Sequence, residues 1–396
     1  MKQINEKMVG IPTSFKPLLL SAILLAGKDI EEVTRESVYA SAIDQDLTDE
    51  HLEKLSSAFA FIKTNRALED NIKELYELVN EKLYDKIREN KLPDILGWFY
   101  AELASSGGDD GKSLGIVLTP QHIQSLMIDL IGLEDGDIIY DCTTGTAGFL
   151  VSSILKGKDA RYIGCEIEDH MFTIAATNMI LRGDGKSNLF IDSCFNVAET
   201  VKALKPTCGV LNPPYSMKDK NYSEISFIEH SLSVVQEGGL VAAIVPKSIF
   251  LDKNKKARVN LLKDHSLIAV ITPPKDLFLE VAGTETAIGV FKAHVPHDKD
   301  IKTWLCEFDD GYKMFPKQGR LEVGDFKALS KQLLNRFRNR EVVEGYSNLV
   351  SIEPEMECLY DCWVSAEKAT SKDFKLKLKD FIVSGLDFKL KGVIND

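Results

Sequence analysis

The fold is decided by the stretch Gly209-Val210-Leu211-Asn212-Pro213-Pro214-Tyr215-Ser216. Its first three residues are small or apolar and predict a short buried strand. Two prolines end that strand, because proline lacks an N–H donor and forces the preceding residue into an extended conformation. Asn212 is therefore expected at the carboxyl end of a strand, where open α/β sheets bind their ligands.

The same stretch suits one kind of chemistry. An exocyclic amine of a purine is a poor nucleophile, because its lone pair is delocalised into the ring. The side-chain oxygen of Asn212 and the carbonyl of Pro213 can accept both N–H hydrogens of such an amine and favour a tetrahedral nitrogen. The ring of Tyr215 can stack on a base drawn out of its helix. A plain proline-stiffened loop is the alternative interpretation.

Apolar runs recur on both sides of this stretch, and helical stretches separate most of them. The runs cover residues 138–141, 162–165, 189–191, 240–245, 267–271 and 286–291. Such alternation predicts an α/β fold with a doubly wound, mostly parallel, Rossmann-like sheet.

Polar residues follow four of the predicted strands: Asp141, Glu166, Asp192 and Asn212. The turn after the first strand contains Gly145 and Gly148, and lacks the third glycine with which dinucleotide folds approach a pyrophosphate. An acid before that turn repels a pyrophosphate but suits an ammonium. The expected ligand carries a ribose, an amino group and a carboxylate but no phosphate. S-adenosylmethionine matches this description.

A second candidate contact precedes the first strand. Thr119 is expected to cap a helix and Pro120 to occupy its first position, with Gly132 at its end. The exposed N–H groups and the Thr119 hydroxyl can bind a carboxylate. A well-capped helix without a ligand is the alternative.

Three regions are expected along the chain. Residues 1–110 predict an N-terminal helical domain, whose clearest helix spans residues 68–92 and ends at Pro93. Residues 111–325 predict the catalytic domain, and residues 326–396 a C-terminal helical or tail region that can dock a partner. The apolar run at residues 18–26 is too short to span a bilayer and predicts a helix of the first domain, so no membrane contact is expected.

Composition limits the partners and the compartment. The 396 residues carry a net charge of −12, which opposes DNA binding unless a partner supplies a basic surface. The seven cysteines lie mostly in apolar runs, which indicates reduced thiols in a cytoplasmic protein. Cys358 and Cys362 have no second Cys or His pair, so no metal site is predicted.

Three motifs in this order resemble those of the N6-adenine DNA methyltransferases. They are Gly115–Pro120, Asp141–Leu150 and Asn212–Tyr215. The closest resemblance is to the modification subunit of type I restriction–modification systems. It extends to the N-terminal region and to residues 238–246, 278–292 and 349–363, so the resemblance covers most of the chain.

The resemblance implies S-adenosylmethionine as cofactor and a role for each matching residue. Glu166 would bind both ribose hydroxyls, Ile167 would pack on the cofactor's adenine, and Asp192 would accept from its amino group. The rest of the implied cofactor site consists of Thr119, Pro120, Asp141, Thr143, Gly145, Gly148, Phe149 and Asn212. The implied catalytic residues are Asn212, Pro213, Pro214 and Tyr215. The chain departs from the family at Cys142, where the family has proline, and at Ala147, where it usually has glycine.

The resemblance also implies partners: double-stranded DNA, a specificity subunit, possibly a restriction subunit, and two copies of this chain in one complex. Two basic clusters can contact DNA or be solvated faces: Lys253, Lys255, Lys256 and Arg258, and Arg336, Arg338 and Arg340. A methyltransferase acting on RNA or on a protein glutamine, and a non-catalytic assembly subunit, stay open as alternatives.

Overall fold

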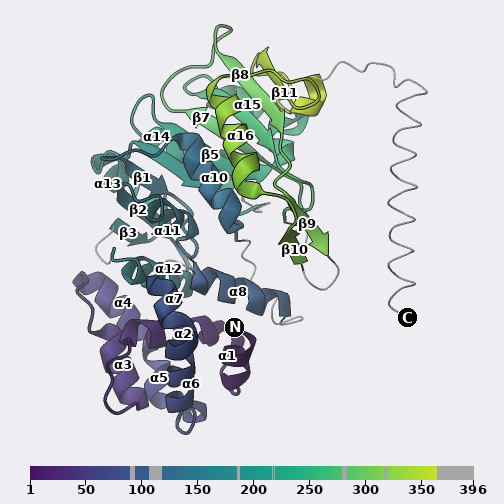
Figure 1. Ribbon diagram of the computed structural model, residues 1–396. Helices are drawn as coiled ribbons and strands as arrows, with labels where there is room; N and C mark the ends of the chain where they lie inside the picture. Colours follow the sequence, from purple (N-terminus) through teal and green to yellow (C-terminus); the bar gives the residue numbers. More distant parts are fainter. Residues whose placement is uncertain are drawn as a thin grey trace, which may run out of the picture. The chain divides into compact units, whose positions relative to one another are not determined.

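The computed structural model describes residues 1–89, 94–106, 118–184, 188–215, 217, 219–278, 283–315 and 319–363. Within these residues the main feature is a nine-stranded sheet with helices on both faces (Figure 1). The α/β fold predicted from the sequence is thereby confirmed.

The strand order in this sheet is β11-β8-β6-β7-β5-β4-β1-β2-β3. Among the described strands, β7 runs antiparallel to both of its neighbours and β11 antiparallel to β8, while all other neighbours are parallel. The strands are β1 (Ile138–Asp141), β2 (Arg161–Glu166), β3 (Asn188–Ile191), β4 (Cys208–Leu211), β5 (Leu240–Pro246), β6 (Ser266–Thr272), β7 (Thr286–Lys292), β8 (Lys302–Glu307) and β11 (Ser347–Ser351). A separate hairpin pairs β9 (Tyr312–Phe315) with β10 (Gly319–Glu322).

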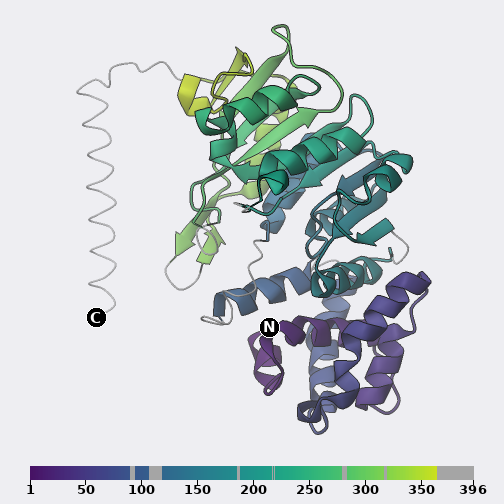
Figure 2. The same cartoon turned by 180° about the vertical axis from the view of Figure 1, so that it is seen from behind.

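Helices cover the two faces of the sheet separately (Figures 1 and 2). One face carries α10 (Gln121–Ile131), α11 (Gly148–Ile154), α12 (Asp169–Leu181) and α16 (Phe326–Arg338); the other carries α13 (Ala198–Ala203), α14 (Glu224–Val234) and α15 (Lys255–Leu261). Both faces are therefore covered, and the central strands β1, β4 and β6 are buried along their whole length.

The chain begins with short helices that share one apolar core. They are α1 (Lys2–Lys7), α2 (Lys16–Ala26), α3 (Arg35–Ile43), α4 (Asp49–Phe59), α5 (Phe61–Thr64), α6 (Ile72–Val79), a π-helical turn η3 (Asn80–Tyr84), α7 (Asp85–Arg88) and α8 (Ile95–Ser106). Short 3-10 turns are η1 (Thr13–Phe15), η2 (Arg66–Leu68), η4 (Lys220–Tyr222), η5 (Lys247–Phe250), η6 (Asp252–Asn254) and η7 (Tyr360–Trp363).

The apolar run at residues 18–26 lies in α2, where residues 17–25 are buried. None of the helices in the described ranges is long and apolar enough to cross a bilayer. The single helix predicted for residues 68–92 is wrong in detail: the helical path starts at Ile72, passes through η3 and ends at Arg88. Pro93 lies outside the described residues.

The N-terminal helices pack directly on the sheet layer through α12. Helices α2, α4 and α8 contact α12, and Nε2 of His51 lies 2.9 Å from the Leu189 carbonyl in β3. At the other end of the sheet, β11 follows residue 326 in the chain and pairs with β8. The domain boundaries at residues 110 and 325 stay a prediction.

Candidate active site

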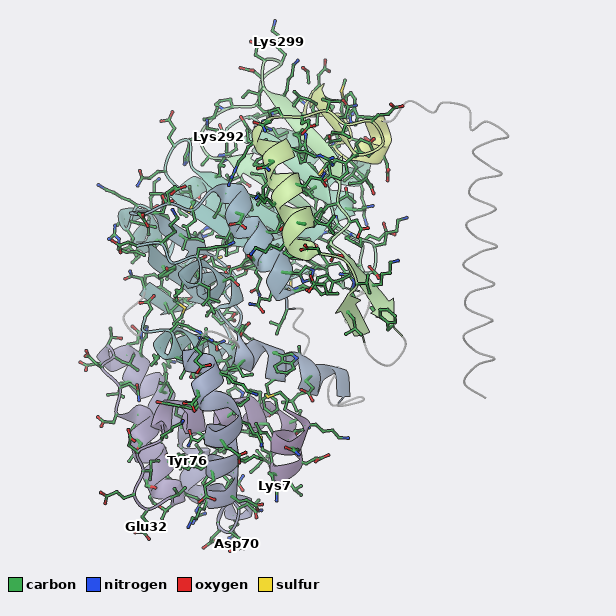
Figure 3. All side chains as sticks on the ribbon, viewed as in Figure 1. Lys7, Glu32, Asp70, Tyr76, Lys292 and Lys299 are labelled. Atoms are coloured by element: carbon green, nitrogen blue, oxygen red, sulfur yellow. The ribbon has the colours of Figure 1, made fainter. Side chains whose placement is uncertain are left out.

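The site is built at the point where the strand order reverses. Strands β1 and β4 are parallel neighbours, and the chain continues from β1 to β2 on one side and from β4 to β5 on the other. A crevice for ligands forms at the carboxyl ends of such a pair. Asp141 ends β1 there, and Asn212 directly follows β4. Lys292 ends β7 opposite Leu240, the first residue of β5. It therefore marks the opposite end of the strands, away from the site (Figure 3).

Asp141 is fully buried and only half satisfied. Its Oδ1 accepts a hydrogen bond from the Thr143 N–H at 3.1 Å, whereas Oδ2 has no partner among the described residues. The hydroxyl of Thr143 is likewise buried without a partner there. Burial, above all, raises the pKa of Asp141 to about 7; the Thr143 N–H lowers this pKa, and the nearby charge of Glu166 raises it. Two buried polar atoms without partners, two residues apart in the chain, fit a polar, cationic ligand group such as an ammonium.

The turn after Asp141 has a strained backbone. Gly145 has φ +56°, and Ala147 has φ +65°, a left-handed conformation that costs a non-glycine residue about 1–2 kcal/mol. This explains why glycine is usual at position 147 in the family. A Cβ at Gly148 would lie 2.3 Å from Nε2 of Gln124, so any other residue there requires the Gln124 side chain to move.

Neither departure from the family pattern obstructs the ligand side of the site. The methyl group of Ala147 is fully buried in the hydrophobic core, and Cys142 is buried in contact with Cys194. Phe149 also lies in that core at the start of α11. Burial raises the pKa of the Cys142 thiol, which keeps it protonated.

Glu166 is held in place by the backbone. Its Oε2 accepts from the Gly145 N–H at 2.9 Å, and its Oε1 accepts from the N–H groups of Ile167 at 2.8 Å and Glu168 at 2.9 Å. Burial raises the pKa of Glu166, and these three donors lower it. Each carboxylate oxygen has two lone pairs, so Oε1 is filled by its two donors and Oε2 keeps one position for a ribose hydroxyl.

The neighbouring positions fit an adenine. Ile167 is 72% exposed, which is unusual for a large apolar side chain and leaves its face available for a planar ring. Asp192 lies one strand further on, after β3, where its Oδ1 accepts from the Ser193 N–H and from Nδ2 of Asn196. The residues of this edge therefore fit S-adenosylmethionine: an acid for the ammonium, another for the ribose, and an apolar face for the base.

The capping prediction for Thr119 is wrong. Pro120 is the N-cap, with ψ 138°, and α10 starts at Gln121. The carbonyl of Pro120 accepts from the Ile123 and Gln124 N–H groups, so Thr119 is left outside the helix. Its hydroxyl instead accepts a hydrogen bond at 3.0 Å from Nδ2 of Asn212. Two residues that are 93 positions apart are thus brought together, and the Asn212 amide is oriented with its nitrogen toward Thr119. Gly115–Val117 of the first motif lie outside the described residues.

The remainder of the third motif is held by a contact with β5. The hydroxyl of Tyr215 donates to the Ile244 carbonyl at 3.3 Å, and burial raises its pKa. Pro213 is buried and Pro214 is exposed. Ser216 lies outside the described residues. The roles predicted for these side chains stay predictions. The structure shows that Asp141 and Asn212 lie at the ends of the neighbouring strands β1 and β4, that Thr119 is bonded to Asn212, and that Tyr215 is bonded to β5.

The basic clusters contribute fewer surface charges than the sequence predicts. Arg258 is 2% exposed and donates to the carbonyls of Ile249, Leu251 and Met356. Arg340 donates to the Ile268 carbonyl. Both guanidinium groups thus bind backbone carbonyls. In the first cluster the lysines at 253, 255 and 256 are the exposed basic residues.

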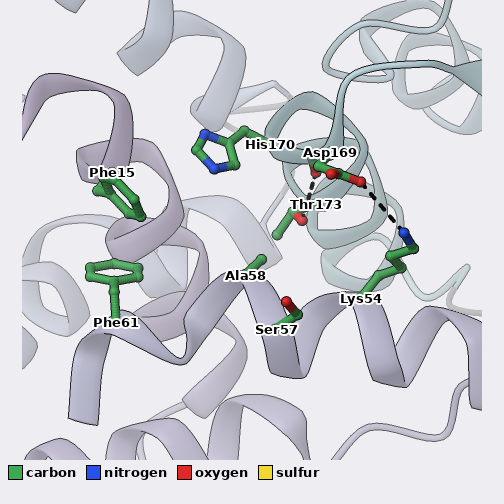
Figure 4. Close-up of a pocket in the computed structure, with 8 residues that line it drawn as sticks. All are labelled: Phe15, Lys54, Ser57, Ala58, Phe61, Asp169, His170 and Thr173. Atoms are coloured by element: carbon green, nitrogen blue, oxygen red, sulfur yellow. Dashed lines mark hydrogen bonds and ion pairs between the residues drawn. The ribbon is translucent and has the colours of Figure 1, made fainter. Parts of the chain in front are cut away.

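A cavity of about 190 Å³ lies elsewhere, between the N-terminal helices and α12 (Figure 4). Phe15, Phe61 and His170 form its aromatic part, and an ion pair of 3.5 Å joins Lys54 to Asp169 at its side. It contains none of the residues predicted for the site. No cluster of His, Cys, Asp and Glu that could hold a metal ion occurs within the described ranges.

Comparison with known proteins identifies the family. The family model described as N-6 DNA Methylase matches residues 88–373. Over 275 residues the chain is 41% identical to the type II restriction enzyme and methyltransferase RM.BcgI of Heyndrickxia coagulans, a match that covers 64% of this chain and 43% of that protein.

More distant relatives share longer stretches. The chain is 22% identical over 372 residues to the type I restriction enzyme MjaVII methylase subunit of Methanocaldococcus jannaschii, covering 83% of this chain and 62% of that one. The chain thus spans less than two thirds of the length of both curated relatives. The type I restriction-modification methyltransferase subunit of Streptococcus thermophilus shares the fold, with a TM-score of 0.63 at 19% identity over 84% of this chain and 77% of that one. Because the family model covers well over half of the sequence, the chain belongs to the N-6 DNA methylase family, whose cofactor is S-adenosylmethionine.

Proposed function

We propose that this chain methylates the exocyclic N6 amine of adenine in double-stranded DNA, at a base flipped out of the helix. One observation carries the proposal: the hydrogen bond between Thr119 and Asn212 holds the amide at the end of β4, next to the half-satisfied carboxylate of Asp141 on β1. An acceptor for the target amine and an anion for the cofactor's ammonium are thereby adjacent.

The proposed roles follow from the contacts. The Asn212 nitrogen donates to Thr119, so its oxygen is the amide atom left to accept an N–H of the amine, together with the Pro213 carbonyl. S-adenosylmethionine, when bound, supplies an activated methyl group. The new C–N bond would form as the methyl–sulfur bond of the sulfonium breaks, which would leave a neutral thioether. The two acceptors would stabilise the cationic nitrogen until it releases a proton to water.

Tyr215 has a separate proposed role. The hydrogen bond from its hydroxyl to the Ile244 carbonyl fixes the ring at the exit of β4, in a position that suits stacking on an extruded base. Pro214, exposed in the same turn, would line the entrance. Glu166, Ile167 and Asp192 would hold the adenosine part of the cofactor.

Charge supports a division of labour between subunits. The chain has a net charge of −12, and two of its seven clustered basic residues are occupied by backbone carbonyls. DNA affinity depends on neutralised phosphates. We therefore propose that the chain acts in the cytoplasm as the modification subunit of a type I-like complex. In that complex two copies assemble with a specificity subunit and possibly a restriction subunit.

Two other functions remain as alternatives. The Asn-Pro-Pro-Tyr motif can also serve methyl transfer to RNA or to a protein glutamine amide, and a chain with this fold can be a non-catalytic assembly subunit. The Thr119–Asn212 contact favours a catalytic role, because a purely structural subunit has no need to orient that amide.

Transfer of tritiated methyl groups to DNA, RNA and protein, with and without the products of neighbouring genes, tests these proposals. The expected result is labelled N6-methyladenine in DNA, strongly dependent on the specificity subunit. Asn212→Ala should lower the rate by about a hundredfold or more, with cofactor affinity within a few-fold of the parental value. Tyr215→Ala should weaken DNA methylation more than Tyr215→Phe, which keeps the ring. Sequence-specific methylation by the purified chain alone would refute the division of labour.

A further inference from the structure

Asp94 is a largely buried carboxylate that no motif accounts for. It precedes α8, in the N-terminal part of the chain, and burial raises its pKa. Its Oδ1 accepts from the Gly97 N–H at 2.8 Å and from Nδ2 of Asn178 at 2.7 Å. Its Oδ2 accepts from the Thr146 hydroxyl at 3.0 Å. One carboxylate thus joins α8, α12 and the turn after β1.

These contacts converge on the turn that faces the proposed methionine site. Thr146 lies between Gly145 and Ala147, the two residues with left-handed backbone. Its side chain donates to Asp94, and its carbonyl accepts from Nδ2 of Asn178 at 2.8 Å. A strained turn persists only where its surroundings hold it. Here the hydroxyl and the carbonyl of the central residue, Thr146, are both hydrogen-bonded.

The same brace reaches the other side of the site. A Cβ at Gly148 would lie 3.1 Å from Oδ2 of Asp94 and 2.3 Å from Nε2 of Gln124, so the start of α11 sits directly against both side chains. Nε2 of Gln124 also donates to the Thr119 carbonyl at 2.8 Å. The turn and Thr119, which contact the cofactor and Asn212 in the proposed function, therefore rest on one buried polar layer.

We propose that Asp94 is a positioning residue for cofactor binding: through Thr146 it holds the turn between β1 and α11 in the conformation that receives the methionine part of S-adenosylmethionine. The proposal rests on the cofactor site of the proposed function. It assigns to the N-terminal helices a direct part in that site, beyond any role in assembly.

The test is calorimetric binding of S-adenosylmethionine and of 5′-methylthioadenosine, which lacks the amino and carboxylate groups. Thr146→Val removes the hydroxyl that Asp94 accepts and keeps the side-chain shape; we expect S-adenosylmethionine to bind on the order of tenfold more weakly. Asp94→Ala should cost more, up to about a hundredfold. The double variant should bind S-adenosylmethionine no more weakly than Asp94→Ala alone. The affinity for methylthioadenosine should change less than about threefold in every variant, because the hydrogen bond that is lost acts on the methionine part of the site.

Two matched controls separate positioning from general stability. Thr146→Ser keeps the hydroxyl and should bind like the parental chain. Thr303→Val removes another buried hydroxyl. Thr303 lies in β8 and donates to the Leu267 carbonyl of β6 at 2.8 Å, so this change should lower the melting temperature without changing cofactor affinity. Unchanged S-adenosylmethionine affinity in Thr146→Val, or an equal loss for both ligands, would overturn the proposal. The binding assay contains no nucleic acid, so its outcome does not depend on DNA methylation. A chain that binds the cofactor but methylates no DNA would refute the proposed function, while a selective loss of S-adenosylmethionine affinity in Thr146→Val would still support the role of Asp94.

Discussion

Replacing Asp141 by Asn should stabilise the cofactor-free protein in a way that depends on pH. Burial raises the pKa of Asp141 from 3.8 to about 7. The folded state therefore binds this proton more tightly than the unfolded state does. The carboxyl group adds stability as the pH falls from about 7 toward 4, and that stability is lost as the pH rises through 7.

The magnitude follows from the pKa difference. About three pKa units at about 1.4 kcal/mol each give roughly 4 kcal/mol of unfavourable free energy for the ionised group at pH 8. Asparagine keeps the bond from the Thr143 N–H and carries no charge, but its amide N–H inherits the unpartnered position of Oδ2. We expect Asp141→Asn to raise the free energy of unfolding by about 2–4 kcal/mol at pH 8. At pH 5 the gain should be roughly 2–3 kcal/mol smaller than at pH 8, because the folded carboxyl group is then protonated and only about one pH unit of the difference remains.

Cofactor binding should move in the opposite direction. The ionised carboxylate pairs with the ammonium, so parental affinity should fall as the pH drops below about 7. Asp141→Asn should weaken binding at pH 8 by about a hundredfold or more, because it removes one partner of a buried charge pair. Urea unfolding at pH 5 and pH 8, together with calorimetry at pH 8, measures both effects. A variant that is no more stable than the parental protein at pH 8 would refute the reasoning.

Four further changes test other parts of the structure. Ile167→Ser should weaken S-adenosylmethionine binding by about 1–2 kcal/mol and leave the melting temperature unchanged, since the side chain is 72% exposed; unaltered affinity would remove Ile167 from the site. Ala147→Val should lower the free energy of unfolding by on the order of 2 kcal/mol, because a β-branched residue enters a buried left-handed position; denaturant titration would contradict this if the variant were as stable as the parental chain. Arg258→Met should lower it by about 3 kcal/mol, since three carbonyls lose their donor, and should leave the salt dependence of DNA binding by the assembled complex unchanged. Alanine at positions 253, 255 and 256 should reduce that salt slope by up to about three without affecting stability, and an unchanged slope would show that this face does not contact DNA.

The sequence predicted those parts of the fold that depend on local pattern. Each apolar run from residue 138 to residue 291 became a strand, because a strand buried on both faces needs a continuous apolar segment. Polar residues that follow parallel strands lie at the same end of the sheet, and for that reason Asp141, Glu166, Asp192 and Asn212 could be assigned to one ligand-binding end in advance. Strands β8 and β11 were missed: β8 has charged residues at both ends, and β11 at the sheet edge contains only two apolar residues, Leu349 and Val350.

Contacts between distant segments could not be predicted in the same way. Thr119 has the pattern of a helix cap, yet its hydroxyl accepts from Asn212, because Pro120 takes the capping position. Asp94 and its partners at 146 and 178 share no spacing that a helix or strand would produce. Arg258 looks like part of a basic surface, and only the tertiary structure shows three carbonyls around it.

The three backbone donors to Glu166 have a consequence for the energetics of recognition. A free glutamate loses about 1.5–2 kcal/mol of rotational freedom when a ligand immobilises it. Here the N–H groups of Gly145, Ile167 and Glu168 have already fixed the carboxylate before any ribose arrives. That entropy is already lost during folding, so its loss does not weaken ribose binding. Since one of the donors belongs to the turn after β1, an amino-acid change that shifts this turn should also release the Glu166 side chain and weaken its hold on the ribose.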